Sequence, residues 1–303
     1  MPFEPCYIKT FETGELKERI KALYKMLENC TICPRNCKVN RIKDELGFCK
    51  VGKDSFISSV GPHFGEEPEL VGRSGSGTIF LTQCNLKCIF CQNYDISHLG
   101  MGREVSLEEL ADSMIYLQKI GCHNINFVTP THQVPQIIAA LEIAIKKGLN
   151  LPLVYNTGGY DSVETLKLLD GIFDIYMPDF KYWDPQVSKK YSKAPDYPEV
   201  ARQVFKEMFR QVGDLVIDER GIALRGLLVR HLVLPEGLAG TKGVMHFIAT
   251  ELSKNTYVNI MDQYRPCYKA PENPPLDRRI SYEEYKEAVE IALAEGLHRG
   301  FPH

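Results

Sequence analysis

The sequence predicts an α/β fold in which a mainly parallel sheet is open or curled into a partial (β/α)6 barrel. Six apolar, strand-like runs alternate with helical patterns along most of the chain. Uninterrupted apolar strands separated by helices are typical of parallel sheets that helices cover. The strand-like runs occupy residues 78–82, 124–129, 151–156, 173–177, 226–234 and 257–261.

The helices between these runs follow from apolar residues at helical spacing. We expect them near residues 106–120, 133–148, 161–170, 197–212 and 241–254. Ser106 with Glu109, and Ser281 with Glu284, match the capping box that begins many helices. The second box predicts a helix in a C-terminal extension, residues 267–303, beyond the barrel region of residues 78–266.

An N-terminal extension, residues 1–77, has a different texture. Residues 15–29 carry an apolar stripe at helical spacing and predict an amphipathic helix. This helix leads directly into a group of cysteines. Residues 58–77 are rich in Gly, Ser, Pro and Glu, and this composition predicts an irregular connection.

The bulk composition fits a cytoplasmic protein. Of the 303 residues, 44% are hydrophobic and 25% are charged, and the formal net charge is −3. This balance gives no reason to expect nucleic acid or an anionic membrane as a partner. The sequence begins without the basic residues and apolar run of a signal peptide. It also lacks the run of about 18 apolar residues that predicts a transmembrane helix.

Ten cysteines are present, and seven of them fall into two tight groups. In a reducing compartment such groups favour metal binding over a disulfide framework. The second group is Cys84-Asn-Leu-Lys-Cys88-Ile-Phe-Cys91, directly after the first strand-like run. Three soft thiolates suit a [4Fe-4S] cluster, and the missing fourth thiolate would leave one iron open for catalysis. The alternatives are a zinc knuckle completed by His98 or Cys122, or three unrelated buried cysteines.

The first group, Cys30, Cys33, Cys37 and Cys49, has the spacing C-x2-C-x3-C-x11-C. Four thiolates on a short loop-rich segment form a closed set, which is typical of a structural metal site. Zinc satisfies this pattern, and so does a second [4Fe-4S] cluster that would relay electrons to the first. The remaining interpretation is a set of free, buried or redox-active thiols.

Polar residues follow most of the strand-like runs, at the edge where parallel α/β folds gather their chemistry. The alternative is that these polar residues have only structural roles, as turn formers, solvent-exposed ion pairs or loop-packing residues. An arginine inside an apolar run is costly unless it is paired, so Arg230 indicates a specific partner. The residues at these ends are Thr129, Thr131, His132, Asn156, Thr157, Asp179, Lys181, Arg230 and Gln263.

The loop from Cys84 to Cys91, with Phe90 before the last cysteine, resembles the signature of the radical S-adenosylmethionine (SAM) superfamily. Within that superfamily, the chain looks most like the branch related to pyruvate formate-lyase activating enzyme. The resemblance covers about residues 78–266 and implies a partial TIM-type (β/α)6 barrel. It also implies that the open iron binds SAM, and that the reduced cluster cleaves SAM to a 5′-deoxyadenosyl radical.

The same resemblance implies roles for single residues. Thr129, Thr131 and His132 stand where the branch has Gly-Gly-Glu, which meets the methionine ammonium group of SAM. Asn156, Thr157, Asp179 and Lys181 would surround the methionine carboxylate, with Arg230 near that carboxylate or the ribose. Phe90 and Asn93 beside the cysteines, and Gln263 near the adenine, complete the expected cofactor contacts.

A radical SAM enzyme needs a one-electron donor, which we expect to be a flavodoxin or a ferredoxin. Its substrate is a glycyl residue of a partner protein, another residue of a peptide or protein, or a small molecule. A non-catalytic, zinc-binding interaction module is the competing hypothesis. Brown colour in anaerobically purified protein would distinguish the enzyme from the zinc module.

Overall fold

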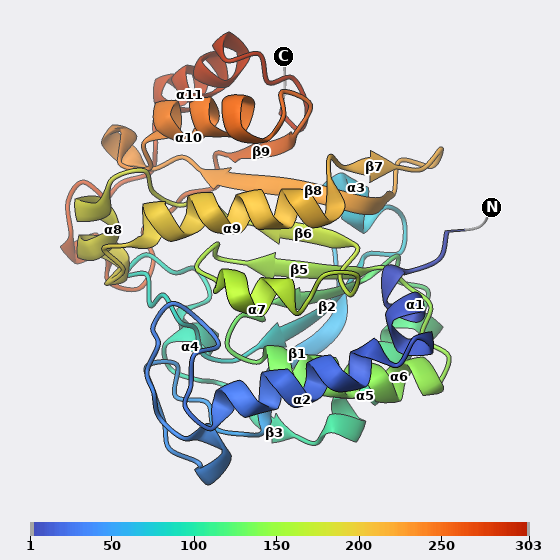
Figure 1. The fold of residues 1–303 in the computed structure, drawn as a ribbon. Helices are drawn as coiled ribbons and strands as arrows, with labels where there is room; N and C mark the ends of the chain where they lie inside the picture. The colour runs from blue at the N-terminus through green and yellow to red at the C-terminus, as the bar shows by residue number, and fades with distance from the viewer. Residues whose placement is uncertain (1–2, 302–303) are drawn as a thin grey trace.

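The computed structural model describes residues 3–301. In this part of the chain nine strands form a mixed sheet in the order β3-β1-β2-β4-β5-β6-β8-β7, with β9 paired to β8 (Figure 1). Six of them run parallel to one another and match the six predicted strands. They are β2 (Ser76–Leu81), β4 (Ile125–Val128), β5 (Leu153–Thr157), β6 (Ile175–Pro178), β8 (Ala223–Leu232) and β9 (Tyr257–Met261).

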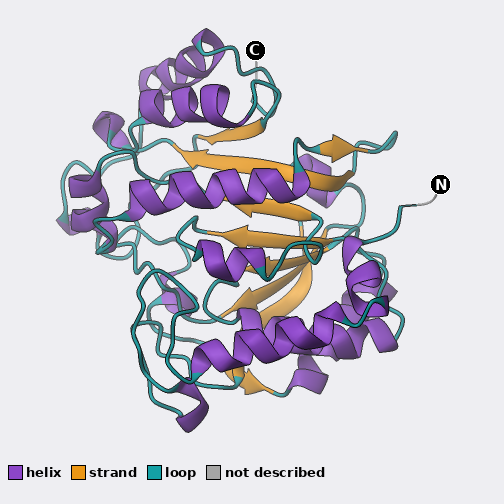
Figure 2. Ribbon diagram, in the orientation of Figure 1, coloured by secondary structure: helices purple, strands orange, loops and turns teal. Residues whose placement is uncertain are grey.

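The predicted helices connect these strands. Both capping boxes form, since the Ser106 and Ser281 hydroxyls each accept from the backbone N–H of the glutamate three residues on. Figure 2 shows helices in front of the sheet and beyond its upper and lower ends. The helices that alternate with the parallel strands are α5 (Leu107–Lys119), α6 (Val134–Lys146), α7 (Val163–Lys167), α9 (Tyr197–Val212) and α10 (Thr241–Phe247), with α10 continuing as a π-helical turn, Ile248–Leu252.

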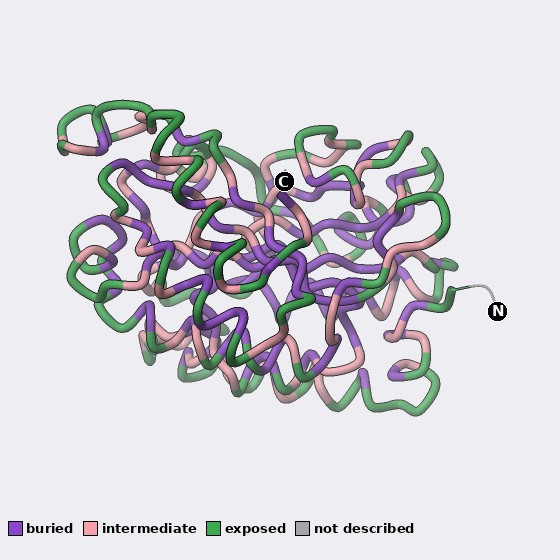
Figure 3. Tube along the Cα trace, turned by 90° about the horizontal axis from the view of Figure 1, so that it is seen from above, coloured by how far each residue is buried: buried purple, intermediate pink, exposed green. Residues whose placement is uncertain are grey.

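Alternation along the strands divides the core between the two faces of the sheet. Tyr155 and Tyr176 pack into the large core beneath the helices. Val154 and Ile175 point the other way, into a smaller core that forms around Leu70. Leu70 belongs to the short helix α3 (Pro68–Val71), which therefore covers the face of the sheet that carries Val154 and Ile175. Figure 3 shows buried chain running through the middle of the molecule.

The N-terminal helix α2 (Glu15–Leu27) packs along α6, and α1 (Cys6–Glu12) packs on α2 and at the starts of β5 and β6 (Figure 1). The helix predicted at residues 15–29 is confirmed. The Tyr7 hydroxyl donates to the Leu151 carbonyl at 2.9 Å, and the Thr10 hydroxyl donates to the Gly171 carbonyl at 2.7 Å. The loop after α2 contains the first cysteine group and the 3-10 helix η1 (Arg41–Lys43).

The prediction of an irregular connection at residues 58–77 is wrong. Strand β1 (Ser55–His63) pairs antiparallel with β2 and with the short strand β3 (Arg103–Val105). Its Gly61 and Pro62 lie opposite Thr78 and Gly77 of β2. The neighbouring strand thus imposes an extended backbone on a composition that favours turns, because strand formation depends strongly on tertiary context.

The remaining elements include strand β7 (Val216–Ile217), helix α8 (Pro185–Ser192), and the 3-10 helices η2 (Pro235–Gly237) and η4 (Ala270–Glu272). The predicted C-terminal helix is α11 (Tyr282–Ala294), which packs on α10. Within the described residues, every helix is too short or too polar to cross a membrane.

Candidate active site

The loop that carries Cys84, Cys88 and Cys91 leaves β2 and ends before the short helix α4 (Tyr94–Ser97). Two of its non-glycine residues, Gln83 and Lys87, have left-handed backbones with φ of 67° and 64°. Such strained positions persist only where surrounding contacts hold them. The Lys87 ammonium supplies these contacts, donating to Gln83 Oε1 at 2.9 Å and to the Ser97 carbonyl at 2.6 Å.

The three thiols of this loop are free and meet polar donors. The Ser192 hydroxyl donates to Cys88 Sγ at 2.9 Å, and Ser97 Oγ lies 3.2 Å from Cys91 Sγ. Burial raises the pKa of Cys88 and raises that of Cys91 to about 11. Metal coordination stabilises the thiolate form of such buried thiols. Hydrogen bonds to sulfur are also what tunes iron–sulfur clusters, so the donor set fits such a cluster.

Neither ligand considered for a zinc knuckle faces these thiols. His98 Nε2 contacts the Cys88 carbonyl at 2.9 Å, and its ring packs 4.4 Å from that of Tyr268. Cys122 lies under helix α5 in the large core. Among residues 3–301, no three Cys, His, Asp or Glu side chains converge around a point that would suit a single metal ion.

Phe90 is an anchor for the cysteine loop. Its buried ring packs edge-on against Tyr182 and Tyr264, with centroid distances of 6.2 Å and 5.9 Å. Asn93 is exposed at the start of α4. Gln263 lies beside the same loop, because its carbonyl accepts from the Gln92 side chain at 3.2 Å. The structure thus brings all three around the cysteines, and their contacts with a cofactor stay a prediction.

Four of the predicted strand-end residues form one polar network. Arg230 of β8 donates through Nε to Asp179 Oδ1 at 2.7 Å and through Nη2 to Asn156 Oδ1 at 2.6 Å. Lys181 donates to the other oxygen of Asp179 at 2.6 Å. Glu66, which precedes α3, adds a second carboxylate, with 3.5 Å between its Oε2 atom and Arg230 Nη1.

The charges in this network stabilise one another. Burial alone would lower the pKa of Lys181, but Asp179 and Cys88 outweigh this effect and raise it to about 12. Burial alone would raise the pKa of Asp179, yet Arg230 and Lys181 hold it below its usual value. Lys181 therefore stays positively charged, and Asp179 stays negatively charged.

Sequence reasoning missed Tyr197, which ties two strand ends together. Its hydroxyl lies 2.9 Å from the Gly158 carbonyl and 2.7 Å from the Asp179 carbonyl, and it accepts from the Lys181 backbone N–H at 2.9 Å. Gly159 packs between these groups with φ of 75°, and a Cβ there would overlap the Asp179 carbonyl oxygen. The only available signal was that Tyr197 begins a helix.

The threonines that follow β4 and end β5 have other side chains of the protein as hydrogen-bond partners. Thr129 has a left-handed backbone with φ of 61°, which is rare for a β-branched residue. Thr131 Oγ1 lies 3.0 Å from Thr157 Oγ1, and Thr157 donates to the buried Asp161 at 2.7 Å. These two threonines therefore face the protein interior.

His132, predicted from the same motif, is fully buried. Its Nε2 atom lies 2.8 Å from the Thr82 carbonyl, and the Arg41 side chain donates to the His132 carbonyl at 2.8 Å. Burial lowers the pKa of His132 to about 3, so the ring is neutral. This environment links the N-terminal extension to the sheet.

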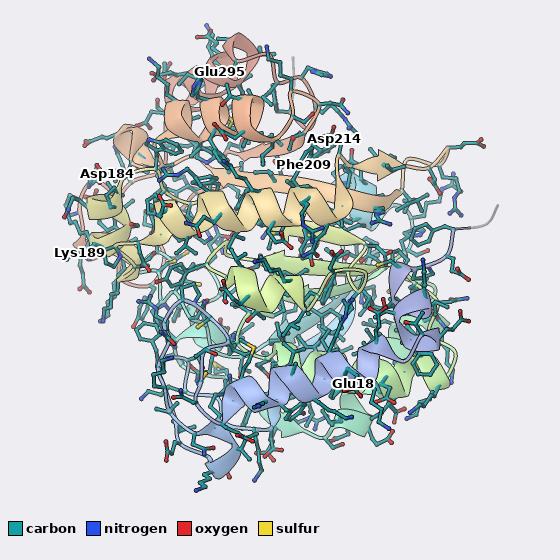
Figure 4. All side chains as sticks on the ribbon, in the orientation of Figure 1. Glu18, Asp184, Lys189, Phe209, Asp214 and Glu295 are labelled. Atoms are coloured by element: carbon teal, nitrogen blue, oxygen red, sulfur yellow. The ribbon has the colours of Figure 1, made fainter. Side chains whose placement is uncertain are left out.

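The four cysteines of the first group lie in the loop after α2, next to the Cys84–Cys91 loop. Lys38 donates its backbone N–H to the Cys30 carbonyl at 3.1 Å, and Phe48 donates its own to Cys37 Sγ at 3.4 Å. Burial raises the pKa of Cys33 to about 12 and raises that of Cys49. In Figure 4 yellow sulfur atoms gather where the N-terminal loop meets the strand ends. A groove of about 740 Å³ between this loop and helix α7 exposes an edge of Cys33.

Residues 78–215 match the radical SAM superfamily. An uncharacterized protein of Methanocaldococcus jannaschii is 35% identical over 283 residues, which make up 90% of this chain and 77% of that protein. The chain belongs to the radical SAM superfamily. A second uncharacterized protein of the same organism is 25% identical over 296 residues, 88% of this chain and 78% of that protein.

Membership in the radical SAM superfamily implies a [4Fe-4S] cluster, bound SAM and an external reductant. It supports an enzyme that cleaves SAM and performs radical chemistry. The matched segment contains the Cys84–Cys91 loop and both Asp179 and Lys181. Arg230, Gln263 and the first cysteine group lie outside it.

Proposed function

We propose that the chain is a radical SAM enzyme in which Cys84, Cys88 and Cys91 hold the [4Fe-4S] cluster. The single observation that carries this proposal is the pairing of the cysteine loop with a fixed positive charge. Lys181 lies close to the loop, because a Cβ on Gly158 would meet both Leu86 Cδ1 at 2.8 Å and Lys181 Cε at 3.4 Å. Asp179 holds the Lys181 ammonium group at 2.6 Å. A thiolate cluster beside an ammonium group is a fitting place for the zwitterionic methionine part of SAM.

Cys84, Cys88 and Cys91 would hold a [4Fe-4S] cluster, which would supply the one electron needed to cleave SAM into methionine and a 5′-deoxyadenosyl radical that would abstract hydrogen from the substrate. The residues of the chain bind and orient the cofactor. Lys181 attracts the methionine carboxylate, and Asp179 keeps Lys181 and Arg230 in place. Asn156 presents a polar side chain to the same place. The six parallel strands act as a partial (β/α)6 barrel around this site, and α3 closes its lower end.

We propose that the substrate is a peptide or protein, as in the pyruvate formate-lyase activating enzymes that the sequence resembles. A small molecule remains the alternative substrate. The first cysteine group binds zinc or a second [4Fe-4S] cluster, and a flavodoxin or ferredoxin in the cytoplasm supplies the electron. Arg35, between Cys33 and Cys37, donates to the Asn85 and Leu86 carbonyls of the Cys84–Cys91 loop, and this proximity of the two cysteine groups supports a role for the first group in the reaction.

Anaerobic reconstitution with iron and sulfide, reduction with dithionite and an assay for 5′-deoxyadenosine test the proposal. The wild-type protein is expected to form product, whereas Cys88→Ala loses both cluster and product. Cys122→Ala, which removes a buried thiol outside both groups, serves as the matched control and keeps both. If a cluster-loaded protein makes no 5′-deoxyadenosine, the hypothesis of a SAM-cleaving enzyme is wrong.

Metal analysis of the Cys84/Cys88/Cys91→Ala triple variant identifies what the first group binds. Iron with sulfide in this variant indicates a second cluster. Zinc without iron excludes an electron relay through Cys30, Cys33, Cys37 and Cys49.

A further inference from the structure

Arg35 lies between the two cysteine groups and contacts both. It belongs to the segment between Cys33 and Cys37. Its side chain extends into the sheet domain, where Nε donates to the Asn85 carbonyl at 2.7 Å and Nη2 donates to the Leu86 carbonyl at 3.2 Å. Asn85 and Leu86 are two of the three residues between Cys84 and Cys88. One side chain of the first group therefore holds the backbone of the second.

The same guanidinium group holds the end of helix α8. Nη2 donates to the Ser192 carbonyl at 3.1 Å, and Nη1 donates to the Lys193 carbonyl. Ser192 is the residue whose hydroxyl donates to Cys88 Sγ. Arg35 thus positions the loop that carries the thiols and also the hydroxyl that contacts the most buried of them. A planar group with five donors suits this set of carbonyls, and a lysine could not reproduce it.

Aromatic rings clamp Arg35 from both sides of the junction. The guanidinium carbon lies 4.0 Å from the ring centre of Phe48 and 5.1 Å from that of Tyr160. Phe48 immediately precedes Cys49, so the clamp is part of the first cysteine group. Asn85 strengthens the junction by donating to the Tyr160 carbonyl at 2.7 Å.

The segment that carries Arg35 has little regular structure of its own. Between α2 and β1 the only helical element is the short η1. A loop of this kind becomes rigid when its four thiolates bind a metal centre such as an iron–sulfur cluster. A filled first group would therefore hold Arg35 more firmly in the position that the structure shows.

We infer that Arg35 is a positioning residue through which metal binding at the first cysteine group orders the Cys84–Cys91 loop. Metal at Cys30, Cys33, Cys37 and Cys49 fixes Arg35 and Phe48, and Arg35 fixes the carbonyls of Asn85, Leu86 and Ser192. Coupling of two binding sites is reciprocal, so a filled Cys84–Cys91 loop also favours the filled first group. The inference rests on the proposed function, because it assigns the cluster with the open iron to this loop.

The test compares Arg35→Gln and Arg35→Lys with Arg19→Gln in the reconstituted protein. Arg19 is a matched control, since it also docks the N-terminal extension through carbonyls, those of Leu168 and Asp170, but far from the cysteines. Hydrogen–deuterium exchange of a peptide covering residues 84–93 reports the order of the loop. A peptide from helix α6 reports whether the variant is folded.

The second measurement is the loss of the cluster to an iron chelator. It follows the electron paramagnetic resonance signal that changes when SAM is added, because only a cluster with an open iron responds to SAM. We expect Arg35→Gln to increase exchange in residues 84–93 and to speed cluster loss about 10- to 100-fold, as changes behind metal ligands commonly do. Arg35→Lys behaves like Arg35→Gln, and Arg19→Gln like the wild type. Equal behaviour of Arg35→Gln and Arg19→Gln overturns the inference.

Cys37→Ser tests the coupling itself. As a single substitution it is expected to increase hydrogen–deuterium exchange in residues 84–93. In the Arg35→Gln background it should add nothing, because both substitutions break the same connection between the two cysteine groups. Additive effects, or no effect of Cys37→Ser on that peptide, would overturn the coupling. A wild-type protein without a SAM-responsive signal refutes the proposed function instead, and the exchange measurements still decide whether Arg35 couples the two groups.

Discussion

Arg230 and Asp179 form an ion pair between the neighbouring strand ends of β8 and β6, with 2.7 Å between Nε and Oδ1. Both side chains are mostly buried, with exposed fractions of 16% and 14%. A buried pair of this kind is costly to break, because the remaining partner keeps its charge without compensation. Here the cost is compounded, since Lys181 depends on the same carboxylate.

Asp179→Asn should therefore leave Arg230 and Lys181 as two poorly compensated cations. We expect the free energy of unfolding to fall by about 3–5 kcal/mol, together with a loss of SAM affinity. Urea denaturation and isothermal titration with SAM measure the two effects. Glu251→Gln, which removes the exposed ion pair with Lys206, is the control and should leave both close to wild type. A similar small effect of Asp179→Asn would contradict the role given to this carboxylate.

Gly159→Ala tests the close approach of the two strand ends. Alanine in the left-handed region costs about 1–2 kcal/mol at any position. At Gly148, where φ is 92° and no atom lies within 4 Å of an added Cβ, we expect only that cost. At Gly159 the methyl group also overlaps the Asp179 carbonyl, so the loss of stability should be clearly larger. Equal losses in the two variants, measured by urea denaturation, would mean that the site tolerates the displacement.

Ser192→Ala removes the hydroxyl that donates to Cys88 Sγ at 2.9 Å. Hydrogen bonds to cluster ligands stabilise the reduced state, so the reduction potential of the cluster should become more negative. A redox titration followed by electron paramagnetic resonance measures the shift. Ser188→Ala lies in the same helix, but its hydroxyl contacts only the Pro185 carbonyl, and it should leave the potential unchanged. An unchanged potential in Ser192→Ala would show that this contact does not tune the cluster.

Two buried histidines predict acid sensitivity of the fold. Burial lowers the pKa of His132 to about 3 and that of His231 to about 4, from 6.5. Between these values and 6.5 the unfolded chain binds protons that the folded protein does not. Each histidine should therefore cost about 1.4 kcal/mol of stability per pH unit as the pH falls below about 6.5. Unfolding free energies at pH 7, 6 and 5 measure the slope, and His132→Gln should make it shallower.

The fold was largely predictable because its six parallel strands are apolar on both faces, and because Ser106 and Ser281 mark helix starts through local contacts. Strand β1 was not, since its Gly61 and Pro62 extend only because β2 lies beside them. Period and composition describe a segment in isolation, whereas a strand rich in turn-forming residues takes its structure from the strands beside it.

The candidate site divides in the same way. Asp179, Lys181 and Arg230 were predicted because they interrupt or end apolar strands, and the fold brings them within hydrogen-bonding distance. Arg35 was invisible, since its partners Asn85 and Ser192 lie 50 and 157 residues away in sequence. His132 stood at a strand end like the others, yet its ring contacts the Thr82 carbonyl in the core. Position along a strand indicates an edge of the sheet, but it does not indicate which way a loop residue turns.

The C-terminal extension also reaches the cysteine loop. The Lys269 backbone N–H donates to the Ile89 carbonyl at 2.9 Å, and the Tyr268 ring stacks on Tyr94 at 5.3 Å. The loop is thus held by residues of both the N-terminal and the C-terminal extension. During synthesis Cys84 to Cys91 emerge long before Tyr268 and Lys269, so the ribosome makes strands β4 to β9 before these contacts can form. The loop therefore becomes an ordered acceptor for iron and sulfide only after the whole parallel sheet has been synthesised.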